Sequence, residues 1–92
     1  MKTTIKPKFK KFLEEVKKLL IDVYGENPEH IHVDDEENLV NYTGYGHGAE
    51  GGIRCETMVP MYDILIADDF PACPEGYFCE PINSWSFGVY KV

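Results

Sequence analysis

The chain has 92 residues, of which 43% are hydrophobic and 27% are charged, and its formal net charge is −7. This length suits one domain with a modest core, and the composition is that of a globular rather than a disordered protein. No apolar run approaches the roughly 18 residues of a membrane span. No apolar segment with a small-residue cleavage site follows the charged N-terminus, so a signal peptide is not expected. An odd number of cysteines, three, fits a reducing compartment. We therefore expect a single compact domain over residues 1–92, in the cytoplasm of its own cell or of an infected host cell.

The charge is divided unevenly along the chain. Residues 1–18 hold seven lysines and two glutamates, a balance of +5. Residues 19–92 hold Arg54 and Lys91 against fourteen acidic residues, a balance of −12. Such asymmetry bears on binding partners and association rates rather than on the fold.

An amphipathic helix is predicted from about Pro7 to Tyr24. Apolar residues recur there at steps of three and four between Phe9 and Val23, which is the period of one helical stripe. Pro7 suits the first helical position, and Gly25 suits the residue that follows a helix. Because lysines and glutamates fill the opposite side, we expect the apolar stripe to pack on another element.

After Gly25 the pattern changes to short segments of β character. Five strands are expected, at His30–Val33, Leu39–Tyr45, Ile53–Met58, Met61–Ala67 and Ser84–Val92. The predicted connections are an acidic turn at Asp34–Glu37, a glycine-dense loop over 44–52 and an irregular stretch at Asp68–Pro81. One helix followed by strands predicts an α+β fold, with an N-terminal amphipathic helix packed on an antiparallel sheet of about four to five strands.

Two histidines and an aspartate alternate at the first predicted strand. His30, His32 and Asp34 would share one face, since alternate residues of a strand point the same way. Two imidazoles and a carboxylate could ligate a transition metal. The alternative is the polar side of a half-solvated strand.

The same stretch resembles the first metal-binding motif of the cupin family. The similar positions are Gly25, His30, His32, Glu37 and Gly44. The second cupin motif is similar to Pro74, Gly76, Cys79 and Asn83, with a cysteine where the family has a histidine. The family also has strands where this chain has its predicted helix. The resemblance implies a metal-dependent enzyme or sensor whose divalent transition metal is held by His30, His32, Glu37 and Cys79.

Cys73 and Cys79 flank a loop that is short enough to be closed by a disulfide or clipped by a metal. Free thiols are the expected state in a reducing compartment. No pattern of a catalytic nucleophile accompanies these cysteines. The glycine-dense loop around His47 contains no lysine and matches no phosphate-binding motif.

Two acidic clusters are the candidate partner-binding sites. Carboxylates at both clusters could steer and dock a basic partner, although solvated turns are the plainer interpretation. Aromatic residues near such a rim, among Tyr42, Tyr45, Tyr62, Tyr77 and Phe78, would anchor the partner. The residues predicted to bind are Asp34, Asp35, Glu36, Glu37, Asp68, Asp69, Tyr45 and Tyr77.

These features favour a small acidic, non-enzymatic binding protein that needs no cofactor. We expect it to dock on and inhibit a basic-surfaced partner, such as a nucleic-acid-handling protein or a toxin, in the manner of immunity or phage anti-defence inhibitors. A balance of −12 over residues 19–92 argues against direct binding to nucleic acid, because phosphates would be repelled. The alternatives are the cupin-like metal protein and an adaptor that makes contact through Lys8, Lys11 and Lys18.

Overall fold

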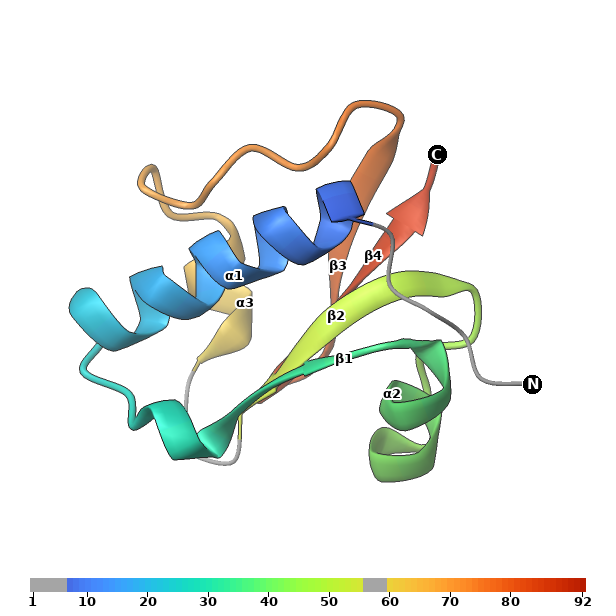
Figure 1. The fold of residues 1–92 in the computed structure, drawn as a ribbon, viewed down its shortest axis with the longest axis horizontal. Coiled ribbons are helices and arrows are strands. Elements are labelled where there is room, and N and C mark those ends of the chain that lie inside the picture. Colours follow the sequence, from blue (N-terminus) through green and yellow to red (C-terminus); the bar gives the residue numbers. More distant parts are fainter. Residues whose placement is uncertain (1–6, 56–59) are drawn as a thin grey trace.

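The computed structural model describes residues 7–55 and 60–92. A long helix crosses one face of a four-stranded antiparallel sheet, and a short helix packs against the other face (Figure 1). The predicted α+β fold with an N-terminal helix on an antiparallel sheet is thereby confirmed. In chain order the elements are α1 Pro7–Asp22, the 3-10 turn η1 Pro28–His30, β1 Ile31–Asp34, α2 Glu36–Thr43, β2 Ala49–Cys55, α3 Met61–Leu65, β3 Tyr77–Asn83 and β4 Ser86–Lys91.

The strands lie in the order β1-β2-β4-β3, so β1 and β3 form the two edges of the sheet. Residues that pair across antiparallel strands point to the same face. One face carries the pairs Ile31–Cys55, Ile53–Phe87 and Val89–Cys79, and it lies against α1. The opposite face carries the pairs His32–Arg54, Gly52–Gly88 and Tyr90–Phe78.

The core lies between α1 and the sheet. The apolar stripe of α1 is buried at Phe9, Phe12, Leu13, Val16 and Leu20. The stripe ends sooner than the sequence predicted, because Val23 lies beyond the last helical residue and is mostly exposed. Gly25 then turns the chain with a φ of 70°, a left-handed conformation that glycine adopts without strain.

The predictions of a strand at Leu39–Tyr45 and of an acidic turn before it are wrong, because α2 occupies this segment. Asp35 caps the helix by accepting a hydrogen bond from the backbone N–H of Asn38, and the first turn is acidic. Gly44 ends the helix with a φ of 79° and donates its N–H to the carbonyl of Val40. The Asp35 cap and the left-handed Gly44 stabilise a helix here despite the β propensity of the residues between them.

The glycine-dense segment is a loop only in its first half, since β2 begins at Ala49. A side chain at Gly52 would place its Cβ 2.2 Å from the carbonyl oxygen of Phe87 and 2.9 Å from Cδ1 of Leu39. Glycine is required there because the side chain of Leu39, which is fully buried, fills the space above the strand. The absence of a side chain at Gly52 therefore lets α2 approach the sheet.

Two further predictions of strands differ from the structure. Residues Met61–Leu65 form the helix α3 instead of a strand, and they bury Met61 and Ile64. The prediction for Ile53–Met58 holds as far as Cys55, and its remaining positions lie outside the described residues. The irregular stretch from Asp68 ends earlier than predicted, because β3 begins at Tyr77.

Candidate functional site

The acidic cluster at residues 34–37 is partly used by the fold itself. Asp34 is buried at the end of β1, where its Oδ2 accepts a hydrogen bond from Nε of Arg54 at 3.1 Å. Asp35 is also buried and caps α2. Glu36 accepts a hydrogen bond from the backbone N–H of Gly48. Of these four carboxylates, only that of Glu37 belongs to a residue that is largely exposed.

The second acidic cluster lies on the other side of the sheet. Asp68 and Asp69 are exposed and follow α3. Residues of α3 share one core cluster with residues of α1, whereas α2 packs on the opposite face through Leu39 and Gly52. The structure therefore does not join the two acidic clusters into one docking surface.

The two tyrosines predicted to bind a partner have different environments. Tyr77 is half-buried, and its ring meets that of Phe9 edge-on with centroids 4.5 Å apart. Tyr77 thus contributes to packing between β3 and α1. Tyr45 lies in the loop between α2 and β2 and is 68% exposed. Of this pair, Tyr45 is the one available to a partner.

The sheet face opposite α1 is only partly covered, because α2 packs over β1 and β2. On β3 and β4 the rings of Phe78 and Tyr90 stack with centroids 5.7 Å apart, and Phe78 is 40% exposed. Tyr42 projects from α2 and is 60% exposed. We call Tyr42, Tyr45, Phe78 and Tyr90 together the aromatic face. Phe78 and Tyr90 point to this side of the sheet from β3 and β4, and Tyr42 and Tyr45 belong to α2 and the loop after it, which lie on the same side.

The aromatic face is bordered by carboxylates. Glu80 alternates with Phe78 along β3 and is exposed. Burial and, next, the negative charge of Glu80 raise the pKa of the Tyr90 hydroxyl above its usual value. The guanidinium of Arg54 lies 3.8 Å from the ring centre of Tyr42 and is already paired with Asp34. The exposed charge next to the Phe78–Tyr90 stack is therefore negative.

Sequence reasoning missed Tyr90 and Glu80 as members of this site. The missed signal was the alternation of Phe78, Glu80 and Ile82, which is typical of a strand with one face toward solvent. Ile82 also lies where the loop between α2 and β2 contacts the sheet. A Cβ at Gly46 would lie 3.2 Å from Cβ of Leu39 and 3.3 Å from Cδ1 of Ile82.

The four metal ligands implied by the cupin resemblance are not brought together. His30 lies in η1 rather than in a strand, and its Nδ1 is buried with no hydrogen-bond partner among the residues that the structure describes. His32 is on the edge strand β1, whereas Cys79 is on the opposite edge strand β3 and faces α1. Within residues 7–55 and 60–92, no three His, Cys, Asp or Glu side chains gather where they could hold a metal ion. The open four-stranded sheet also differs from a cupin barrel.

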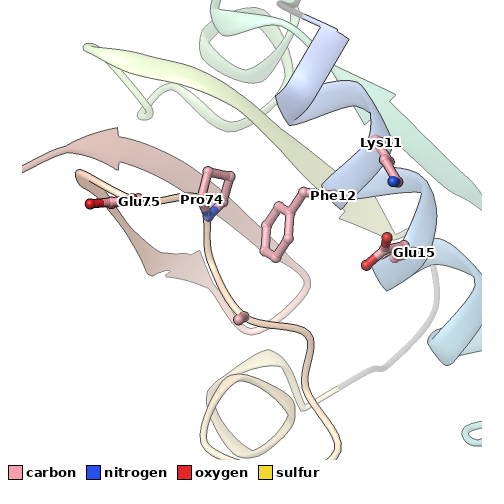
Figure 2. A pocket seen from close by; sticks show the side chains of 6 residues that line it. Lys11, Phe12, Glu15, Pro74 and Glu75 are labelled. Carbon is pink, nitrogen blue, oxygen red and sulfur yellow. The ribbon is translucent and has the colours of Figure 1, made fainter.

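A shallow groove separates α1 from the loop that precedes β3 (Figure 2). Its volume is about 410 Å³, and it is lined by Lys11, Phe12, Glu15, Ala72, Pro74 and Glu75. The groove offers one ammonium and two carboxylates around an apolar floor, but its lining contains no histidine, cysteine or hydroxyl that could act as a nucleophile or base.

The three cysteines are all thiols, and two of them are neighbours. Cys55 is fully buried on β2. The sulfur of Cys79 lies 3.3 Å from that of Cys73. The sequence left open whether a disulfide or a metal joins Cys73 and Cys79. In this structure the two residues are thiols in close contact.

No family model, curated protein or solved structure matches the chain. Among the described residues, no helix has the length and apolar character needed to cross a membrane.

Proposed function

We propose that this chain is a small, non-enzymatic binding protein that docks through its aromatic face on a basic surface of another protein and thereby blocks that surface. The observation that carries this proposal is the stack of the exposed Phe78 on the half-buried Tyr90, next to Glu80, on the part of the sheet that neither α1 nor α2 covers. No described cluster supports catalysis or a bound metal with similar force.

Aromatic side chains supply the contact energy in this proposal. Phe78, Tyr42 and Tyr45 keep 40%, 60% and 68% of their surface accessible to solvent. Large aromatic rings in the centre of an interface are the usual hot spots, because they bury much area and lose little conformational entropy. A grouping of this kind on one side of a 92-residue chain is a natural anchor for a protein partner.

The charge of the chain selects a basic partner. Glu80 and Glu37 are exposed on the side of the sheet that carries the aromatic face, and the whole chain has a net charge of −7. Carboxylates around an apolar centre speed the association with a positive surface and disfavour nucleic acid or an acidic protein. If the basic surface normally binds nucleic acid, occupation by this chain would exclude that ligand.

The proposal is tested by comparing matched variants on the two sides of the sheet. The immobilised protein is exposed to the basic fraction of a cell lysate, retained beforehand on a cation exchanger, and bound proteins are quantified by mass spectrometry. Phe78→Ala and Glu80→Lys alter the aromatic face, whereas Tyr62→Ala and Asp69→Lys make equivalent changes at exposed residues on the α1 side.

A specific partner should bind about tenfold less to Phe78→Ala and Glu80→Lys, which is the scale expected of hot-spot residues. Binding should also weaken as salt is added and stay nearly unchanged in the two control variants. The proposal is wrong if the captured proteins are lost with Tyr62→Ala or Asp69→Lys but retained by both variants of the aromatic face. It is equally wrong if the partner's contact surface, mapped by cross-linking, is acidic.

A further inference from the structure

We propose that Cys73 and Cys79 are a reversible dithiol–disulfide site, in which Cys73 attacks a small-molecule disulfide of the glutathione class and Cys79 resolves the product. The inference is separate from the binding function proposed above. It rests on the placement of the two sulfurs, on the direction of the hydrogen bond between them and on the turn that joins them.

A tight turn brings the two cysteines together. The backbone N–H of Tyr77 donates to the carbonyl of Pro74 at 3.1 Å, and Gly76 has a φ of 86°. A glycine with positive φ at the third position of such a turn is typical of type II geometry. Cys73 precedes the turn and Cys79 follows it on β3, so the chain folds back and places their sulfurs 3.3 Å apart. A bond of about 2.0 Å then needs only a small movement of the loop that bears Cys73.

The two thiols differ in a way that assigns their roles. Burial raises the pKa of Cys73, while the hydrogen bond that it accepts from the Cys79 thiol acts in the opposite direction. Burial and, next, the contact with Cys73 raise the pKa of Cys79. The Cys79 thiol donates its hydrogen bond to the sulfur of Cys73, which favours the thiolate at Cys73. Cys73 also lies on the loop before β3, whereas Cys79 is held within the strand. The thiolate is the nucleophile in thiol–disulfide exchange, so Cys73 is the attacking residue.

The reaction proceeds in two exchanges. The Cys73 thiolate attacks one sulfur of oxidised glutathione, which forms a mixed disulfide and releases one glutathione thiolate. Cys79 then gives up its proton and attacks the sulfur of Cys73, which forms the Cys73–Cys79 bond and releases the second glutathione. The two protein thiols lose two electrons, the glutathione disulfide gains them, and the two thiol protons end on the two glutathione molecules.

Cys73 is half-buried against the core and does not line the groove beside α1, but its sequence neighbours Ala72 and Pro74 do (Figure 2). Attack on a disulfide in the groove therefore requires this loop to turn Cys73 outward. The ammonium of Lys11 on the opposite wall can attract a carboxylate of glutathione, whereas the nearby carboxylates of Glu15 and Glu75 repel one. Once formed, the disulfide would tie this loop to β3 and so fix one wall of the groove.

The test uses the full chain in glutathione buffers of defined oxidised-to-reduced ratio, followed by acid quenching, alkylation of free thiols and mass spectrometry. The wild-type protein should carry two alkyl groups fewer as the ratio rises, because two thiols have become a disulfide, and added reductant should restore the full labelling. Proteolysis between Cys73 and Cys79, for example after Tyr77, should leave two peptides that are joined by the disulfide. Cys55→Ala should behave as the wild type does.

The variants separate the two roles. Cys79→Ser should accumulate a glutathione adduct on Cys73, whereas Cys73→Ser should accumulate much less adduct on Cys79. The proposal is overturned if the wild type forms only glutathione adducts, or if the mapped disulfide includes Cys55. Equal adduct formation in both serine variants would refute the assignment of Cys73 as the attacking thiol. The wild-type peptide map decides the existence of the disulfide even if a variant folds poorly.

Discussion

At the scale of single residues, the pair formed by Asp34 and Arg54 links β1 to β2 on the side that faces α2. The two side chains are only 8% and 12% exposed, and Oδ2 and Nε lie 3.1 Å apart. Two charges removed from water in this way depend on each other, because the loss of one leaves the other poorly solvated. Arg54 also lies against the ring of Tyr42, so this ion pair helps to position one member of the aromatic face.

Substitution of Asp34 tests this dependence. Asp34→Asn should lower the free energy of unfolding by about 2 kcal/mol, because the guanidinium of Arg54 keeps its burial and loses its counter-charge. The measurement is equilibrium unfolding in urea. Glu37→Gln removes an equivalent charge from an exposed residue and should change stability by no more than about 0.5 kcal/mol. Equal losses in the two variants would show that the ion pair contributes nothing specific.

The sequence predicted which residues share a face here but not what they contact. Alternation correctly places His32 and Asp34 on the same side of β1. The partner of Asp34 is Arg54, which is 20 positions away, and their contact exists only once β1 and β2 pair. A run of acidic residues therefore resembles a single surface feature in the sequence, whereas in the structure Asp34 is buried in its pair with Arg54 and Asp35 is buried as the cap of α2.

At the scale of elements, α2 depends on its ends more than on the residues inside it. It has eight residues, and only Leu39 is fully buried. A helix this short is not stable by propensity alone. The cap from Asp35 and the left-handed Gly44 therefore contribute directly to the position of Tyr42 and of the loop that carries Tyr45.

Removal of the cap tests this role. Asp35→Ala should lower the free energy of unfolding by about 1 kcal/mol, because the backbone N–H of Asn38 loses its acceptor. Urea unfolding followed by far-UV circular dichroism measures the effect. Asp68→Ala makes the same change at an exposed loop residue and should be close to neutral. If Asp35→Ala is as stable as Asp68→Ala, the cap does not stabilise α2.

The elements differ in how well the sequence predicts them. The period of α1 is long and regular, so its existence, its direction of packing and the α+β class are predicted correctly. The segment of α2 is rich in β-formers, and its helix signals, Asp35 and Gly44, lie only at its ends. β3 was missed because the three prolines and the glycine of Asp68–Pro81 predicted an irregular stretch, and the last of these prolines, Pro81, lies within β3. Proline is tolerated there since β3 is an edge of the sheet, where an N–H can be spared.

At the scale of the whole molecule, the covering of the sheet is asymmetric. α1 spans one face, and α2 covers only the β1–β2 part of the other (Figure 1). The exposed part on β3 and β4 carries the Phe78–Tyr90 stack. The sequence could predict a helix packed on a sheet, but not which strands remain uncovered, because that depends on the strand order and on the approach of Leu39 to Gly52.

The buried thiols and Tyr90 make the folded molecule sensitive to alkaline pH. Burial and, next, the hydrogen-bonded contact with Cys73 raise the pKa of Cys79, and burial with the charge of Glu80 raises the pKa of Tyr90. The ordinary pKa values are 9.0 for the thiol and 10.0 for the phenol. With rising pH, the unfolded chain therefore loses these protons first, and each ionisation adds to a net charge that is already −7.

The free energy of unfolding should consequently be constant near neutral pH and fall as the pH rises above about 9. The stabilising contribution of the neutral groups is complete below the unfolded pKa and is lost toward the raised folded pKa. Urea unfolding under reducing conditions, from about pH 7.5 to about pH 10.5, measures this slope. Cys79→Ser, which removes the most strongly affected thiol, should give a shallower decline than the wild type. A profile that is flat up to the highest pH, or equally steep in the variant, would show that burial of Cys79 does not couple its ionisation to folding.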